Sequence, residues 1–299
     1  MATNLHYYFN KRYFDGIGIE VRENRGRREL VVADLPYTRN CPIKEYRLPA
    51  QVPALFHRNL PYTHLFEFEV GYPGLVTGVG LGHEINAKGE FKLGMHFDFT
   101  YGIPVIYGSS IKGVLHSHFR DFTDHMRIED GKLELYVSPL TRNDAKGYRV
   151  ADYPEFSRML EKSIFGSSLD TEDEEHELGC EYQDVFFDAV PYAENKTGSI
   201  LSADYLCPHG ESPYKNPIPI SFLRISPGVK IRLAFQLRET TLEWGGKTIP
   251  VTQKFKYVLF KNMLSDLGLG AKTNVGYGVL TPISVSWKEA DGSISKTTY

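Results

Sequence analysis

The sequence has little of several features that would define a class of protein at once. Its three cysteines, Cys41, Cys180 and Cys207, lie far apart and form no CxxC pair, which excludes a disulfide framework and a zinc knuckle. No uncharged hydrophobic run is long enough to cross a bilayer, and the first residues, MATNLHYYFNKRYF, lack the hydrophobic core of a signal peptide. These absences predict a cytoplasmic protein with no membrane partner.

The sequence also lacks an excess of basic charge. Its 299 residues contain 34 Lys and Arg against 37 Asp and Glu, a formal net charge of −3. A nucleic-acid site, if the chain has one, must therefore be a local patch. One short basic cluster, RENRGRR at residues 22–28, is either a solvated turn or an arm that contacts phosphate.

Hydrophobic periodicity predicts a mixed fold of strands and helices. LFEFEV alternates from His64 onward as in a half-buried strand, and residues 229–238 form the clearest strand in the chain. A serine, Ser109 or Ser110, is expected to cap a helix over about 110–126, and further helices are expected over 154–166 and 251–268. Other strands are expected over 183–190, 199–206, 218–225 and 279–287. In the last of these, Val279, Thr281, Ile283, Val285 and Trp287 are expected on one face.

The order strand, helix, strands, helix, strand predicts an α+β fold, a ferredoxin-like βαββαβ core with large insertions. We expect this domain over residues 61–290, with insertions near 127–182. An N-terminal extension over 1–60 and a C-terminal tail over 291–299 flank it. The acidic run at 169–177 has no hydrophobic face and predicts a loop.

A glycine-rich loop, GLGAKTNVGYG, occupies residues 268–278. Its glycines allow positive φ angles and close approach of a ligand to the backbone, and exposed N–H groups in such a loop bind anions. Lys272 adds a charge, and Thr273 and Asn274 add neutral hydrogen bonds. The loop is not a Walker A motif, because GxxxxGK[ST] is absent. It is either a phosphate-contacting loop, which we favour, or a tight connection from helix to strand.

A second motif, YGSSIKG at residues 107–113, turns from a strand into a helix. The first N–H groups of a helix and its dipole favour an anion, and Lys112 lies in the first turn. Ser109 and Ser110 add hydroxyl groups. The alternative is an ordinary serine cap with an exposed lysine.

The histidines predict no metal site and no cofactor. His118 and His125 are separated by two helical turns, too far apart to share one metal ion, and HExxH is absent. His83 and Glu84 could form a ligand pair, but a packed or solvated role is the more frequent one for such residues.

Residues 102–113, GIPVIYGSSIKG, resemble the G-x-P-x-I-P-G-S-S-x-K-G signature of the RAMP superfamily of CRISPR-associated RNA-binding proteins, and the loop at 268–278 resembles that superfamily's C-terminal glycine-rich loop. The turns LCPHG at 206–210 and NPIP at 216–219 resemble one subunit family of the type III-B (Cmr) complexes. The resemblance runs from about His64 to Trp287. Tyr107 replaces a proline of the signature, His116 stands where an arginine is frequent, and Gly210 replaces a tyrosine.

The resemblance implies an RRM-related core and a non-catalytic structural subunit. Such a subunit holds the 3′ part of the guide RNA (crRNA) and its duplex with target RNA, and contacts other Cmr complex subunits. The residues expected to contact RNA, all from the two motifs or next to them, are Ser109, Ser110, Lys112, His116, Gly268, Gly270, Lys272, Thr273, Asn274 and Gly276.

Two other functions remain open from the sequence. One is a metal-independent endoribonuclease that processes guide-RNA precursors, with His96 or His116 as general base and Lys272 stabilising the developing charge. The other is a protein-interaction module in which the glycine-rich loop grips a neighbouring subunit.

Overall fold

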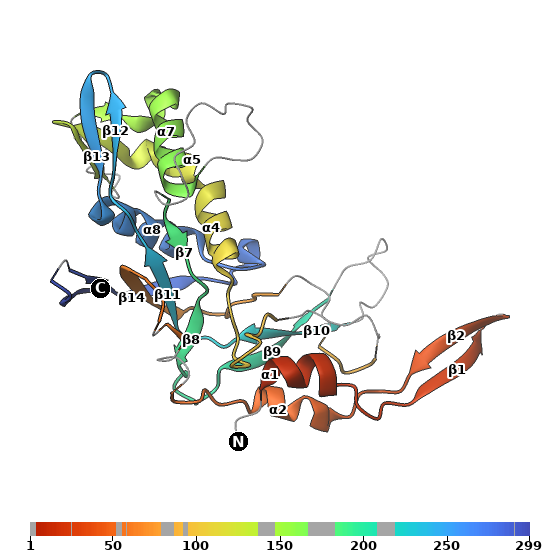
Figure 1. Cartoon of the computed structure of the whole chain (residues 1–299). Helices are drawn as coiled ribbons and strands as arrows, with labels where there is room; N and C mark the ends of the chain where they lie inside the picture. The colour runs from red at the N-terminus through yellow and green to blue at the C-terminus, as the bar shows by residue number, and fades with distance from the viewer. Residues whose placement is uncertain are drawn as a thin grey trace.

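A computed structural model describes residues 4–24, 26–51, 56–57, 59–78, 87–91, 95–136, 147–166, 183–207, 219–289 and 291–299. Its largest element is a six-stranded antiparallel sheet in the order β15-β14-β3-β11-β7, with β8 also paired to β11 (Figure 1). The strands are β3 (His64–Val70), β7 (Val185–Phe186), β8 (Val190–Ala193), β11 (Lys230–Gln236), β14 (Leu280–Lys288) and β15 (Ile294–Thr298). The mixed helix-and-sheet class predicted from the sequence is confirmed.

Two helices connect the central strands. Helix α4 (Gly108–Ser117) lies between β3 and β7 in the chain, and α8 (Gln253–Leu267) lies between β11 and β14. Since β3 and β8 both run antiparallel to β11, and β11 and β14 both run antiparallel to β3, each helix joins two parallel strands. The two strand–helix–strand units are interleaved, because each has a strand of the other between its own strands.

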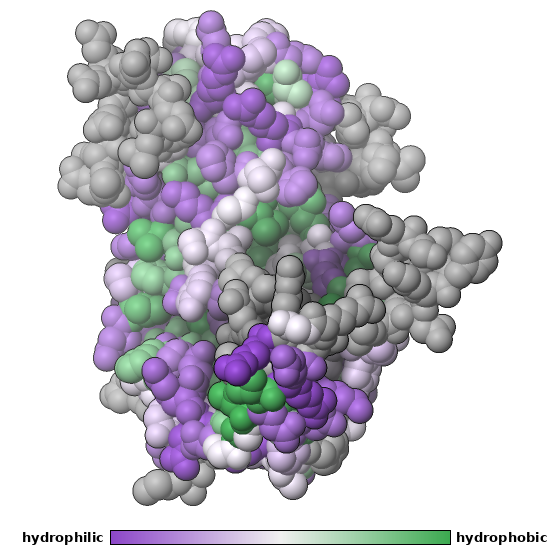
Figure 2. All heavy atoms as spheres, turned by 90° about the vertical axis from the view of Figure 1, so that its right-hand side faces the viewer, coloured by the Kyte–Doolittle hydropathy of each residue, from purple (hydrophilic) through white to green (hydrophobic). Residues whose placement is uncertain are grey.

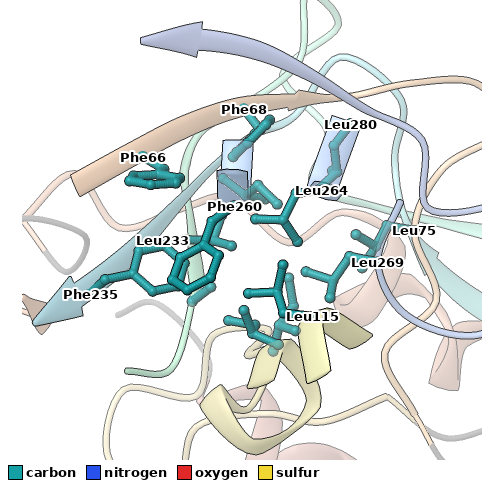
Figure 3. Close-up of a cluster of buried hydrophobic side chains, with 14 of the residues drawn as sticks. Phe66, Phe68, Leu75, Leu115, Leu233, Phe235, Phe260, Leu264, Leu269 and Leu280 are labelled. Carbon is teal, nitrogen blue, oxygen red and sulfur yellow. The ribbon is translucent and has the colours of Figure 1, made fainter. Parts of the chain in front are cut away.

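The core lies between this sheet and the two helices. Phe66 and Phe68 of β3 and Leu233 of β11 are buried, because every second residue of a strand faces the same side. Figure 3 shows them packed against Phe260 and Leu264 of α8 and against Leu115 of α4. Burial of each such side chain contributes about 1.5–3 kcal/mol. The predicted strand at 229–238 and helix at 251–268 are therefore confirmed, with Thr252 capping α8 and Gly268 ending it.

The face predicted for the last strand is wrong in its first half. Val279 is 45% exposed and Thr281 is also exposed, whereas Leu280 is buried. The register shifts between Pro282 and Ser284 where β14 pairs with β3. A bulge of this kind inserts one residue and exchanges the two faces. Beyond the bulge, Val285 is buried and Trp287 packs against the core, so these two residues share one face as expected.

The helix predicted over about 110–126 is shorter and begins earlier. α4 starts at Gly108 with Tyr107 as its N-cap, so neither serine caps it. It ends at Ser117, and α5 (Phe119–Phe122) and a 3-10 turn follow. Met126 instead starts strand β4 (Met126–Glu129), which forms a hairpin with β5 (Lys132–Leu135). Asp130 and Gly131 make this turn with positive φ angles, as a tight hairpin requires.

The remaining elements extend the core at its edges. β6 (Tyr148–Arg149), α7 (Pro154–Phe165) and the hairpin of β12 (Thr240–Trp244) and β13 (Lys247–Val251) lie beyond the helices. β9 (Leu201–Leu206) and β10 (Ile220–Ile225) form a separate two-stranded ribbon. α7 and both ribbon strands match sequence predictions, and Pro219 lies just outside β10. β15 pairs with β14, so the residues expected to form a C-terminal tail belong to the sheet.

The N-terminal residues also belong to the core. α1 (Leu5–Tyr7), a π-helical turn (Tyr8–Arg12) and α2 (Cys41–Lys44) bury Leu5, Phe9 and Ile43. Between them, β1 (Ile19–Asn24) and β2 (Arg27–Val32) form a hairpin that projects from the body (Figure 1). The basic cluster lies at its tip. In Figure 2 the hairpin points toward the viewer, with hydrophobic residues next to hydrophilic ones; Ile19 and Val21 are 66% and 63% exposed.

Within the described residues, no helix has the length and hydrophobicity needed to span a membrane.

Candidate RNA-binding surface

The glycine-rich loop leaves the end of α8 and returns to the sheet at β14. A Cβ on Gly270 would lie 2.3 Å from the carbonyl oxygen of Val76, and one on Gly278 would lie 2.0 Å from that of Leu269. Both residues also have positive φ angles. Glycine is therefore required at these positions by the close approach of two backbone segments of the same chain.

Two of the predicted backbone donors of the loop are not available to a ligand. The Gly268 N–H donates to the carbonyl oxygen of Leu264, and the Gly276 N–H donates to that of Thr273. The prediction that these glycine amides bind phosphate is wrong, because the helix end and the turn use them. What the loop presents instead is side chains: Thr273 and Asn274 are exposed in a 3-10 turn, η7 (Thr273–Val275).

Lys272 has an unusual backbone conformation. Its φ and ψ angles are 64° and 30°, the left-handed region that favours glycine. For a residue with a side chain this conformation costs roughly 1 kcal/mol. The side chain is half-buried, and its Nζ lies 5.8 Å from the centre of the Phe222 ring. The turn thus holds a lysine where a glycine would be less strained.

The start of α4 carries Ser109 and Ser110, both exposed, and the half-buried Lys112 one turn later. The first N–H of the helix, that of Gly108, donates to Oδ1 of Asp188 at 2.7 Å. A carboxylate of the chain therefore occupies the place that the sequence predicted for a bound phosphate. The N–H of Gly108 is therefore not available to a ligand, whereas the serine hydroxyls and the Lys112 ammonium group are.

A series of contacts connects the two motifs. The Ala271 N–H of the loop donates to the Val76 carbonyl oxygen at 2.9 Å, and Oγ1 of the next residue, Thr77, accepts from the His96 N–H at 3.3 Å. The His96 ring stacks on that of Tyr107, the N-cap of α4, with 4.5 Å between ring centres. Leu115 of α4 and Leu269 of the loop share one buried cluster (Figure 3).

Both lysines are uncompensated in the part of the chain that the structure describes. Neither Lys112 nor Lys272 has a salt-bridge partner there. Each motif therefore presents one lysine without an ion-pair partner among the described residues, together with neutral hydroxyl or amide groups, a set of side chains that suits an anion.

Comparisons with known proteins agree with the sequence resemblance. The family model of the RAMP superfamily matches residues 67–281, which include both motifs. The chain belongs to the RAMP superfamily. Over 238 residues it is 32% identical to the CRISPR system Cmr subunit Cmr6 of Pyrococcus furiosus, an alignment that covers 68% of this chain and 64% of that protein.

The fold of this RAMP protein is also found in a solved structure. A chain of the cryo-EM structure of the type III-B Cmr-beta bound to cognate target RNA matches 88% of this chain and 76% of its own length. The TM-score is 0.51 and the identity is 18%. The crystal structure of Cmr6 from Pyrococcus furiosus matches 73% of this chain with a TM-score of 0.37 and 24% identity.

His116, at a position where RAMP proteins often have arginine, faces α7. Its Nε2 lies 3.0 Å from Oε1 of Glu161, and its ring stacks on Phe165 at 4.8 Å. Glu161 also pairs with Arg120. The structure thus links His116 to α7, through an ion pair of its Nε2 and stacking of its ring.

Sequence reasoning missed a group of residues formed by Tyr277 of the loop and two side chains of the β9–β10 ribbon of this RAMP protein. The Tyr277 hydroxyl donates to Oδ2 of Asp204 at 2.7 Å, and Asp204 pairs with Arg224 at 3.3 Å. Burial and this hydrogen bond raise the pKa of Tyr277 to about 12. Asp188 was missed as well. Only tertiary structure brings Asp204, Arg224 and Asp188 to the motifs, so no local pattern could identify them.

Several predicted features lie outside the described residues: His83, Glu84, the acidic run at 169–177, Pro208 to Gly210 and most of NPIP. Within the described part, no group of three or more His, Cys, Asp or Glu side chains could hold a metal ion.

Proposed function

We propose that this protein is an RNA-binding structural subunit of a type III-B CRISPR ribonucleoprotein. The similarity to Cmr6 and the likeness to a chain of a Cmr complex support this assignment. In the proposed role it contacts guide RNA, target RNA and neighbouring Cmr subunits in the cytoplasm, and it cuts no RNA itself. The 3′ part of the guide and its target duplex are the RNA that it would hold.

The sheet supports a ferredoxin-like, RRM-related core as the scaffold for this role. The strands of the two interleaved units stand in the order β14-β3-β11-β8, with both helices on one face. The second face carries a cluster of paired charges, against which the Tyr192 ring of β8 packs at 4.4 Å from the Arg232 guanidinium. Glu67 there pairs with Arg232 at 2.8 Å and with Lys296 at 3.3 Å. We therefore assign RNA binding to the surface formed by the two motifs.

The observation that carries the proposal is the placement of Lys112 and Lys272 in two motifs that Val76, Thr77, His96 and Tyr107 connect. Two lysines next to exposed hydroxyl groups suit a sugar-phosphate backbone. Contacts of this kind position an RNA strand but read no base. Binding should therefore tolerate changes of sequence and weaken steeply with salt.

The test is the affinity of the full chain for fluorescently labelled single-stranded guide RNA, measured between 50 and 300 mM salt, a range chosen because ionic contacts weaken strongly across it. Each of Lys112→Ala and Lys272→Ala should reduce the magnitude of the slope of log K against log salt by about 0.7. The loss should be equal across guide sequences. Lys254→Ala, an exposed lysine at the opposite end of α8, is the matched control and should leave the slope unchanged.

A loss that follows one base, or slopes that equal those of the Lys254→Ala control, would contradict phosphate binding at this surface. If Lys272→Ala impairs assembly with neighbouring subunits while the RNA affinity stays constant, the protein-interaction module is the better description.

One observation keeps the endoribonuclease as a second candidate. His96 lies against Tyr107 at the start of α4, and burial lowers its pKa, which favours the neutral ring that a general base needs. His116 suits this role less, because Glu161 binds it. Specific cleavage of precursor RNA in EDTA that is lost in His96→Ala would favour this candidate over the structural subunit.

A further inference from the structure

One highly exposed aromatic residue lies beside the glycine-rich loop. Tyr72 is 84% exposed, the largest fraction among the exposed large hydrophobic side chains of the described residues. The Gly71 N–H donates to the Val279 carbonyl oxygen at 2.8 Å, and the Gly278 N–H donates to that of Gly74 at 2.7 Å. The residues before and after Tyr72 in the chain are thus both hydrogen-bonded to the end of the loop.

The neighbours of Tyr72 give this surface a defined form. We use the name loop platform for Tyr72, Lys272, Val275 and Tyr277. The Tyr277 ring packs edge-on against Phe222 at 5.8 Å, and the Lys272 Nζ lies at 5.8 Å from the same Phe222 ring. Val275 is 69% exposed. Since Asp204 accepts a hydrogen bond from the Tyr277 hydroxyl, the Tyr277 ring is fixed, while the ring of Tyr72 stays open to a ligand.

An exposed ring on a segment bonded to a lysine-bearing loop suits one class of ligand in particular. Single-stranded nucleic acid offers a planar base to stack on the ring and a phosphate for the lysine of the loop. A protein partner would instead have to cover Lys272 and the Arg224–Asp204 pair together with a single tyrosine and a valine, which costs desolvation of charged groups for little hydrophobic burial. The chemistry of the loop platform therefore favours an unpaired nucleotide.

We propose that Tyr72 stacks on an unpaired base of the RNA strand whose phosphates Lys272 contacts. This inference rests on the proposed function and extends it, because phosphate contacts alone do not distinguish single strands from duplexes. A base within a duplex is already stacked and paired. The loop platform thus gives the protein a preference for an unpaired stretch of RNA at this point, without a preference for a particular base.

The test compares three variants of the full chain with two probes, a labelled 12-nucleotide oligouridine and a blunt RNA duplex of equal length. Tyr72→Ala should weaken binding of oligouridine by about tenfold, within the range found for loss of one stacked base. It should change duplex binding by less than about twofold. Tyr72→Phe keeps the ring and should bind oligouridine as tightly as the unsubstituted chain. Phe99→Ala removes another exposed ring, one that is 78% exposed, and should change neither affinity.

A second measurement uses the ribonucleoprotein reconstituted with the full chain and RNA that contains 4-thiouridine. Ultraviolet irradiation should crosslink the peptide that carries Tyr72, and Tyr72→Ala should abolish this crosslink.

The outcomes separate this inference from the proposed function. If Lys272→Ala weakens RNA binding and Tyr72→Ala does not, stacking is refuted and the phosphate site stands. If neither variant weakens it, both fail. Unchanged RNA affinity together with impaired assembly in Tyr72→Ala would make the residue a protein contact and overturn the inference.

Discussion

Lys272 is the residue on which the candidate site depends most, and its backbone shows why it is unusual. A left-handed conformation is common for glycine and rare for lysine. The loop contains glycines at 268, 270, 276 and 278, all with positive φ angles. Lys272, between the second and third of them, also has a positive φ angle but carries a charged side chain. Strain at one residue that the surrounding structure maintains is frequent at functional sites.

The strain and the charge of Lys272 can be separated by substitution. Lys272→Gly and Lys272→Ala both remove the charge, but only glycine relieves the backbone. We expect Lys272→Gly to unfold at a higher urea concentration than Lys272→Ala, by about 1 kcal/mol in the free energy of unfolding. Both should bind RNA equally weakly. Equal stability of the two variants would show that the turn does not hold residue 272 in the left-handed region.

The residues of the site were predictable only in part. The motifs gave Lys112, Lys272, Ser109, Ser110 and Thr273, because local glycine and serine patterns mark exposed turns. The partners that use up the Gly108, Gly268 and Gly276 amides were not predictable. Asp188 lies 80 residues from Gly108 in the chain, and only the fold brings the two together.

At the scale of elements, the sequence predicted those whose period is regular. β3 alternates strictly, β11 alternates except at the buried Ala234, and α8 has a capping threonine and a terminal glycine. Prediction failed where tertiary contacts decide. The bulge in β14 exchanges its faces, and β15 and the short N-terminal helices are stable only because they pair with β14 or bury residues such as Leu5.

A buried ion pair connects two of these elements. The Lys256 Nζ of α8 lies 2.9 Å from Oδ2 of Asp184, just before β7, and it donates to the Arg238 carbonyl oxygen at 2.7 Å. Both side chains of the pair are fully buried. Removal of one partner leaves an unpaired charge in the interior, which is strongly destabilising.

We expect Lys256→Met to lower the free energy of unfolding by about 3–5 kcal/mol, measured by urea denaturation. Lys254→Met, an exposed position on the same helix, should change it by less than about 0.5 kcal/mol. In the double variant Lys256→Met/Asp184→Leu both charges of the pair are removed, so part of the stability should return. A double variant as unstable as the sum of its two single variants would show that the pair is not coupled.

At the scale of the whole molecule, the N-terminal residues and the sheet form one cooperative structure in which two buried histidines take part. His57 is 4% exposed, and its Nε2 donates to the Asp188 carbonyl oxygen at 3.2 Å. Because the Asp188 carboxylate also accepts from the first N–H of α4, His57 connects the N-terminal region to the start of that helix. His64 of β3 is 1% exposed and stacks with Trp287 of β14. The N-terminal region therefore cannot separate from the core without exposure of His57.

Burial gives the stability of the whole chain a defined dependence on pH. It lowers the pKa of His57 and of His64 from 6.5 to about 4. In the unfolded chain both rings take up a proton below pH 6.5, whereas in the folded chain they stay neutral until about pH 4, so acid favours unfolding in this window. Between pH 7.5 and 5, each histidine should lower the free energy of unfolding by about 2 kcal/mol. Urea denaturation at several pH values measures this slope. His57→Gln and His64→Gln should each reduce this slope by the amount that corresponds to about one proton bound on unfolding. An unchanged slope in the double variant would mean that other groups cause the dependence.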